Sequence, residues 1–157
     1  MPNWCVGDLK IRGTKENLKS FCENELLIDG EKKGVQLELN EDDYCFYLKC
    51  ENAYYLWIQG TRRHFIEVNG YDEYCCKYYD DEDEVMIILP MKAAWGIESE
   101  PLRVLSEKYH IDFRIKGYEC GVGFTQEIEI LDGEITLNEE QNYDDYIWEC
   151  ENPFVGG

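Results

Sequence analysis

Apolar and polar residues alternate near the start of the chain, and this pattern predicts a strand followed by a helix. In the stretch GDLKIRG, residues 7–13, Leu9 and Ile11 alternate with charged residues, as in a strand with one buried face. Thr14 can then cap a helix, because its hydroxyl accepts a hydrogen bond from the first turn, and apolar residues recur at helical spacing behind it. The first unit is therefore expected to be a strand and a helix.

The next part of the chain has the pattern of several short strands. Four stretches, VQLELNE, DYCFYLKC, AYYLWIQG and RHFIEVN, are separated by acidic or Asn/Gly turn residues between positions 35 and 69. The following stretch YDEYCCKYYDDEDE, residues 71–84, is so acidic that an exposed loop is expected. Residues 35–84 together are predicted to be a β-rich insertion with an acidic loop.

The second half returns to the order of strand, helix and strands. The continuous apolar run VMIILPM at residues 85–91 suits the middle of a sheet, and Ser99 and Pro101 can begin a second helix. IDFRIKGYE alternates again, and a hairpin is expected to turn at Asp132-Gly133. The acidic C-terminal tail covers residues 139–157, and its stretch NYDDYIWECENPFVGG, residues 142–157, is interpreted as an edge strand or a partly disordered segment.

The order of these elements predicts an α+β fold. A strand, a helix, several strands, a second helix and further strands match a ferredoxin-like split βαβ sandwich, with two helices on one face of a mainly antiparallel sheet. The β-meander would be inserted into this sandwich. A length of 157 residues fits a single domain, residues 1–157.

The net charge of the chain limits the classes of macromolecule that it is expected to bind. The chain has 34 acidic residues against 15 Lys and Arg, for a formal net charge of −19. Direct binding to DNA or RNA is not expected, because it depends on cationic side chains that displace counterions from phosphates. Lys116 is the last basic residue, and eleven acids follow it. A macromolecular partner is expected to be basic; the alternative is that the carboxylates only keep the protein dispersed.

The eight cysteines are interpreted as reduced, buried thiols in a cytoplasmic protein of a bacterial host cell. The N-terminus lacks the pattern of a secretory signal, and no apolar stretch is long enough to span a bilayer. Cys75 and Cys76 are adjacent, and no two cysteines have the two-residue spacing common in zinc sites. DDEDE at residues 80–84 lacks the alternating ligands of a calcium loop. Neither a metal nor another cofactor is expected.

Three stretches resemble one family. The start MPNWC, the segment Ala94-Trp95-Gly96 and the segment GYECGVGF at residues 117–124 are similar to the YubB-type ferredoxin-like family of phages, plasmids and other mobile elements. The resemblance implies a ferredoxin-like fold and a mobile-element origin, but no activity. Trp4 is expected to close one end of the core, and the Trp95 ring to pack against a tight turn; contact of either ring with a ligand is the alternative.

Two segments combine tyrosines with carboxylates, as recognition surfaces do when aromatic side chains fill pockets and carboxylates pair with Arg or Lys. One is the acidic loop and the other is the tail; a merely solvated edge is the alternative for both. The predicted partner-binding residues are Asp72, Glu73, Tyr78, Tyr79, Asp80, Asp81, Glu82, Asp83 and Glu84 in the loop, and Tyr143, Asp144, Asp145, Tyr146 and Trp148 in the tail.

The leading functional hypothesis is a non-enzymatic protein of a phage or mobile element that inhibits a host defence protein. It would present carboxylates to the basic nucleic-acid channel of a CRISPR effector or another nucleic-acid enzyme, in the manner of an anti-CRISPR protein. Two alternatives stay open. One is an accessory or oligomerisation domain of a larger assembly, including a homo-oligomer. The other is a small-ligand binder or enzyme that uses the basic cluster Arg62-Arg63-His64.

Overall fold

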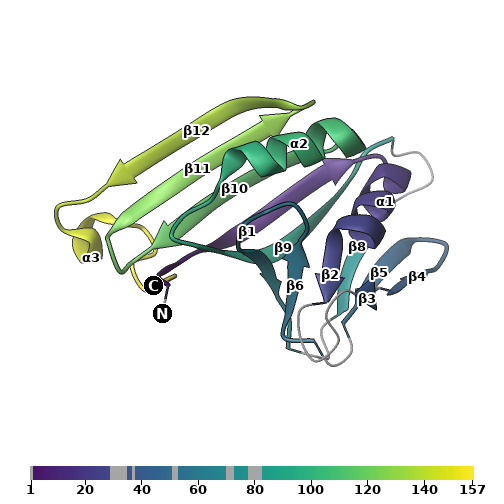
Figure 1. Ribbon diagram of the computed structural model, residues 1–157, viewed down its shortest axis with the longest axis horizontal. Coiled ribbons are helices and arrows are strands. Elements are labelled where there is room, and N and C mark those ends of the chain that lie inside the picture. The colour runs from purple at the N-terminus through teal and green to yellow at the C-terminus, as the bar shows by residue number, and fades with distance from the viewer. Residues whose placement is uncertain (1, 29–34, 37, 51–52, 70–72, 78–82) are drawn as a thin grey trace.

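The structure is a computed structural model that describes residues 2–28, 35–36, 38–50, 53–69, 73–77 and 83–157. Two antiparallel sheets and three helices form the described part (Figure 1). In chain order the elements are β1 (Trp4–Gly13), α1 (Lys15–Glu25), β2 (Leu26–Ile28), β3 (Val35–Gln36), β4 (Glu38–Glu41), β5 (Cys45–Lys49), β6 (Tyr55–Ile58), β7 (His64–Glu67), β8 (Glu73–Lys77), β9 (Val85–Ala94), α2 (Ser99–Tyr109), β10 (Asp112–Glu119), β11 (Phe124–Leu131), β12 (Glu134–Asn142) and α3 (Tyr146–Glu149).

The large sheet holds most of the strands. Among the described residues it has nine strands in the order β12-β11-β10-β1-β9-β7-β6-β2-β3, and a small sheet has three in the order β4-β5-β8. The small sheet packs against β9, where the thiol of Cys76 donates to the backbone oxygen of Met86 over 3.6 Å, and its residues Phe46 and Leu48 belong to the buried core. It also meets α1, where Lys19 forms an ion pair with Glu41.

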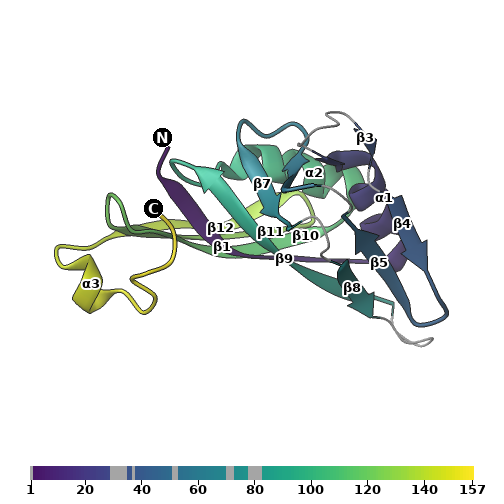
Figure 2. The ribbon, with the colours of Figure 1, turned by 90° about the horizontal axis from the view of Figure 1, so that it is seen from below.

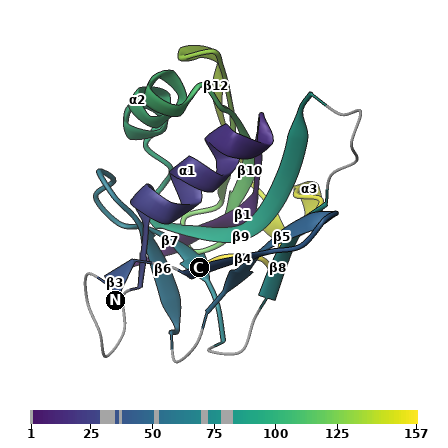
Figure 3. The same ribbon diagram turned by 90° about the vertical axis from the view of Figure 1, so that its right-hand side faces the viewer.

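The core lies between the large sheet and the two longer helices. β1 is hydrogen-bonded to β9 on one side and to β10 on the other, and Leu9, Ile11, Leu89 and Phe113 of these strands are buried on one face. Both helices cover this face (Figure 3). Phe21 of α1 packs edge-on against Phe113, with ring centroids 5.7 Å apart. Because alternate side chains of each strand face the helices, residues from both halves of the chain meet in one core.

Local signals fix the ends of several elements as predicted. Thr14 caps α1, because its hydroxyl accepts from the backbone N–H of Asn17 at 3.2 Å. The hairpin of β11 and β12 turns at Asp132 and Gly133, which have φ of 48° and 77°. Positive φ at both central residues is the geometry that an Asp-Gly pair favours in a two-residue hairpin loop. The predicted hairpin turn is confirmed.

The predicted ferredoxin-like two-helix sandwich is wrong, because the protein is a β-rich fold with two sheets. In a split βαβ unit, the strand after the first helix would lie beside β9. Here β2 pairs with β6 instead, and β7 takes the place beside β9. Alternation along a segment shows that a strand has one buried face, but it does not show which strand will be its neighbour.

The strands of the predicted meander are divided between the two sheets. Of its strands, β4 and β5 belong to the small sheet and β3, β6 and β7 to the large one. The predicted loop at residues 71–84 contains a strand, β8, in which Cys76 is buried between the exposed residues Cys75 and Lys77. Its many acids and tyrosines concealed this alternation.

The apolar run of β9 and the tail differ from expectation too. β9 does lie inside the large sheet, but Met86 and Ile88 are 47% and 45% exposed on the face opposite the helices. The tail forms no edge strand of its own: residues 139–142 complete β12, and the short helix α3 follows. In the part of the chain that the structure describes, no helix has the length and apolar character needed to cross a membrane.

Candidate functional site

Large apolar side chains face solvent in the segment that begins with α3. Trp148 is 87% exposed, Phe154 85% and Ile147 60%. Exposed apolar residues of this size, grouped and bordered by polar residues, are typical of binding surfaces. Neighbouring carboxylates are exposed as well. We call the group the Trp148 surface: Ile147, Trp148 and Phe154 with Asp144, Asp145 and Glu149.

The Trp148 surface is held by packing beneath α3. Tyr146 is buried, and its ring lies edge-on to that of Tyr143 with centroids 5.4 Å apart. Gly123 has φ of 91° and lies against Tyr146, where a Cβ would come within 3.4 Å of the tyrosine. The carboxylate of Asp145 accepts from the backbone N–H of Trp148 at 3.3 Å and caps α3. A surface fixed in this way loses little conformational entropy when it binds.

The carboxylates of the Trp148 surface have no cationic partner within the described residues: no Lys or Arg nitrogen there lies within 4 Å of Asp144, Asp145 or Glu149. Glu151 differs, since it accepts from Lys116 at 2.7 Å and from the hydroxyl of Tyr118 at 2.5 Å. These two donors, Lys116 foremost, hold the pKa of Glu151 below its ordinary value. Glu151 therefore attaches the tail to β10. The carboxylates of Asp145 and Glu149 accept backbone hydrogen bonds within the α3 segment, but no described cation neutralises them or Asp144.

The predicted residues of the acidic loop are only partly described. Asp72, Tyr78, Tyr79, Asp80, Asp81 and Glu82 lie outside the described residues. Glu73 is exposed on β8, opposite Lys49, and Asp83 and Glu84 are exposed before β9. Glu84 lies 3.8 Å from Arg12.

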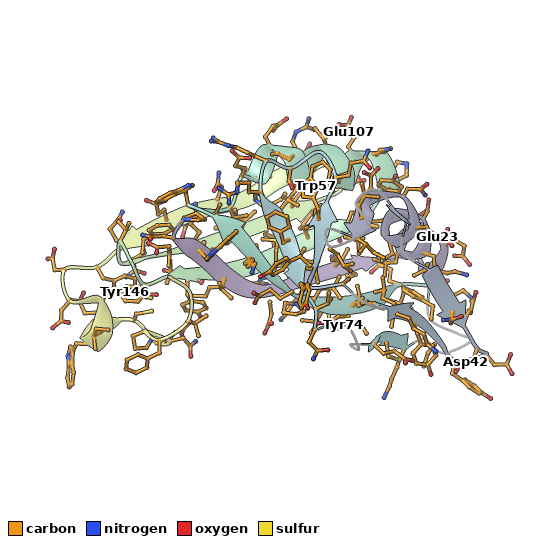
Figure 4. All side chains as sticks on the ribbon, turned by 60° about the horizontal axis from the view of Figure 1, so that its bottom comes forward. Glu23, Asp42, Trp57, Tyr74, Glu107 and Tyr146 are labelled. Carbon is orange, nitrogen blue, oxygen red and sulfur yellow. The ribbon has the colours of Figure 1, made fainter. Side chains whose placement is uncertain are left out.

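The two predicted segments are not brought together. α3 projects from one end of the large sheet, and β8 lies toward the opposite end (Figure 2). Tyr146 and Asp42, which lies beside the small sheet, mark these ends in Figure 4. Of the predicted tail residues, Asp144, Asp145 and Trp148 belong to the exposed surface, Tyr143 is half-buried and Tyr146 is buried beneath α3.

A second candidate site is a cavity of about 250 Å³ at the start of α2. Three parts of the chain line it: residues 62–64 ahead of and within β7, residues 94–98 between β9 and α2, and Gln126 of β11. We call it the Arg62 pocket. It unites the basic cluster seen in the sequence with the Ala94-Trp95-Gly96 segment, which the sequence had not placed beside it.

His64 supports the wall of the Arg62 pocket. Its side chain is almost fully buried, and Nε2 accepts from the backbone N–H of Glu98 at 3.0 Å. That hydrogen bond places the ring proton on Nδ1 at neutral pH, and Nδ1 has no hydrogen-bond partner among the described residues. Burial lowers the pKa of His64 to about 4, so the ring is neutral at pH 7.

The three segments that carry the family resemblance meet beside this pocket. Trp95 has φ of 70°, and its backbone N–H donates to the backbone oxygen of Asn3 at 2.9 Å. A Cβ at Gly121 would come within 2.5 Å of the Asn3 amide, and one at Gly117 within 2.7 Å of Ile97. The glycines of GYECGVGF thus allow the chain start and the approach to α2 to pack closely.

The two tryptophans of these segments lie differently from expectation. Trp4 does not close an end of the core; it is half-buried within β1, with its ring 6.1 Å from that of Phe65 and 4.9 Å from the Lys92 ammonium group. The ring of Trp95 is 60% exposed instead of packed. Its positive φ turns the backbone toward α2 and leaves the indole at the rim of the pocket.

Glu119 organises the turn between β10 and β11, close to both sites. It is fully buried, and its two oxygens accept from the backbone N–H groups of Gly121 at 2.8 Å and Val122 at 2.7 Å. Both donors would otherwise lack an acceptor in this tight turn. The same loop includes Gly123, against which the Tyr146 side chain packs.

We expect Glu119→Gln to lower the free energy of unfolding by about 2 kcal/mol, because the amide nitrogen of Gln cannot accept the second backbone hydrogen bond. Urea denaturation monitored by circular dichroism measures this change. Glu134→Gln, on the exposed edge of β12, is the matched control and should leave the midpoint unchanged. Equal stability of the Glu119 and Glu134 variants would contradict this role.

The thiols show no paired or ligating arrangement. All eight cysteines are free, and burial raises the pKa of Cys5 to about 12. Within the residues that the structure describes, no three His, Cys, Asp or Glu side chains are grouped so as to hold a metal ion.

Some residues of the two sites were missed by sequence reasoning. Ile147 and Phe154 are not among the predicted binding residues, because the sequence does not show whether an apolar residue is exposed. Gln126 holds the pocket wall by accepting from the backbone N–H of Ile97 at 2.7 Å. No spacing links it to Arg62, since only the pairing of the large sheet brings the two together.

Comparison with known proteins finds no family model, no curated protein and no solved structure that matches this chain. The resemblance to the YubB-type family stays a prediction.

Proposed function

We propose that the protein is a non-enzymatic binding protein whose Trp148 surface docks onto a basic, nucleic-acid-binding surface of a partner. Occupation of that surface would keep nucleic acid out. The observation that carries the proposal is the exposure of Trp148 and Phe154, both more than four-fifths exposed, in a segment with three carboxylates that have no cationic partner among the described residues.

The composition of the Trp148 surface suits a basic partner with an apolar pocket. Tryptophan is among the residues that contribute most binding energy when it fills a pocket, and carboxylates around it pair with Arg or Lys. A net charge of −19 adds long-range attraction to a positive surface and repulsion from nucleic acid. The partner is thus expected to be a protein that itself binds a polyanion.

The concrete form of the proposal is an inhibitor of a CRISPR effector or a related bacterial defence enzyme, made by a phage or mobile element and acting in the host cytoplasm. Such effectors hold nucleic acid in positively charged channels. The resemblance to a mobile-element family and the acidic surface both favour this form. The C-terminal segment is the proposed contact, while Asp83 and Glu84, which come just before β9, would lie outside it.

Phage plating on bacterial strains that each carry one active CRISPR system tests this form. Expression of the wild-type protein should restore plaques on at least one strain. Trp148→Ala should abolish most of this rescue, because removal of a central aromatic residue weakens binding by about tenfold or more. Tyr54→Ala, which removes another exposed aromatic side chain, is the control and should leave rescue intact.

Two results would contradict the proposal. One is a failure to restore plaques on every strain by a protein that is folded and abundant in the cell. The other is a concentration-dependent dimer that survives high salt and is lost on Trp148→Ala, which would assign the same surface to self-association and favour an oligomerisation domain.

A further inference from the structure

We propose that the Arg62 pocket binds a small phosphate ester carried by a planar ring, such as a nucleoside monophosphate. This site is separate from the Trp148 surface and does not depend on its function. The inference rests on the pocket's two guanidinium groups, which pair with no described carboxylate, on the start of α2, which has no side-chain cap, on the buried His64 and on the position of the Trp95 ring.

The guanidinium groups of the pocket are exceptional in this acidic chain. The three arginines elsewhere, Arg12, Arg103 and Arg114, each lie within 3.4 Å of a carboxylate oxygen. Within the described residues, no carboxylate lies within 4 Å of Arg62 or Arg63. Arg63 also lies over the Trp4 ring, 5.6 Å from its centroid. Two adjacent cations that no described carboxylate neutralises are positioned to bind an anion from solution.

The start of α2 also favours the binding of an anion. Glu98 occupies the N-cap position, but its side chain makes no capping hydrogen bond. The backbone N–H groups of a first helical turn and the positive end of the helix dipole favour a negatively charged group. Glu98 lines the pocket together with Arg62 and Arg63, so the helix start and the two guanidinium groups face one cavity. Glu98 is the one acidic residue in the described lining, and its backbone N–H is already bound to His64.

His64 gives an independent indication of a polar ligand. It lines the pocket, is 1% exposed, and leaves Nδ1 as a buried donor without a partner. A buried donor of this kind is unfavourable unless it has a role in a site or meets a bound group. Its other nitrogen is already occupied by the backbone of Glu98, which keeps the pocket wall in place.

The Trp95 ring selects for a planar ligand. Its backbone is fixed by a positive φ and by the hydrogen bond to Asn3, yet its ring is 60% exposed at the edge of the pocket. Exposed, positioned indole rings stack on nucleobases. A cavity of about 250 Å³ lies below the usual range for drug-sized ligands and suits a small one. Polynucleotides are disfavoured because the protein's net negative charge repels them.

Isothermal titration calorimetry with adenosine monophosphate is the test, with adenosine, inorganic phosphate and a 5′-phosphorylated oligonucleotide as comparison ligands. The monophosphate should bind about tenfold more tightly than adenosine or phosphate, because only it engages both the cations and the indole ring. Arg62→Gln should weaken its binding by about tenfold or more. Trp95→Ala should remove the preference for the monophosphate over inorganic phosphate.

Arg114→Gln is the matched control, since it removes the same charge from the opposite face of the sheet and should leave binding unchanged. Equal weakening by Arg62→Gln and Arg114→Gln would overturn the site, because it would show unspecific attraction. A failure to detect binding of the monophosphate at a concentration of about 10 mM would also overturn the site, because even a dissociation constant of about 1 mM gives measurable binding there. Tighter binding of the oligonucleotide would overturn the small-ligand form and assign the pocket to a nucleic-acid end. None of these outcomes bears on the Trp148 surface.

Discussion

Acidification from pH 7 to pH 4.5 is expected to remove about 2.5 kcal/mol of stability through His64 alone. In the folded protein burial lowers the pKa of this ring to about 4, whereas its ordinary value is 6.5. The unfolded chain therefore takes up a proton below pH 6.5 that the folded protein binds only near pH 4. Stability that is present above pH 6.5 is lost as the pH falls through this window.

Urea denaturation at the two pH values, on wild type and on His64→Gln, isolates this contribution from that of the carboxylates. Gln keeps an acceptor for the backbone N–H of Glu98 but does not titrate. The variant should lose about 2.5 kcal/mol less than wild type over the same pH change. An equal loss in both proteins would show that the buried ring does not titrate as inferred.

The largest structural effect is expected from Gly7→Val in the middle of β1. A Cβ at position 7 would overlap the backbone oxygen of Lys116 on β10, and Gly117 lies close behind it. Because β1 is hydrogen-bonded on both sides, it cannot move away without losing its pairing with β9 or β10. We expect a loss of about 3 kcal/mol or more in the free energy of unfolding.

Thermal or urea denaturation measures this effect, with Asp8→Val as the control. Asp8 is the next residue of β1 and its side chain is exposed, so a valine side chain meets solvent there. The control should change stability by about 0.5 kcal/mol at most. Near-equal stability of the two variants would show that β1 and β10 are not as close at Gly7 as the structure has them.

Sequence reasoning succeeded where the cause is local. The cap at Thr14 and the Asp132-Gly133 turn depend on neighbouring residues, so the pattern could predict them. The fold class failed because it depends on strand pairing. β2 has only three residues, and nothing in Leu26–Ile28 indicates that it pairs with β6 and not with β9.

Only part of each candidate site could be predicted from the sequence. Trp148 and its acidic neighbours could be named because aromatic and acidic residues together are typical of binding surfaces. Tyr146 has the same sequence signature but is buried, since Gly123 provides the place where its side chain packs. Of the Arg62 pocket, only the basic cluster Arg62-Arg63-His64 could be named from the sequence. The rest could not, because the pocket forms only where β7, β11 and the approach to α2 meet.

Competition between the protein and target DNA for a purified CRISPR effector, chosen from a strain on which plaques are restored, tests the central claim most directly. The protein should displace DNA at about 50 mM salt and do so much less well at about 500 mM, because screening weakens charge attraction. Asp144→Asn with Asp145→Asn should weaken displacement by about tenfold, while Asp83→Asn with Glu84→Gln should not. Equal displacement by both double variants, or none by the wild-type protein, would contradict the proposal that the Trp148 surface occupies a nucleic-acid channel.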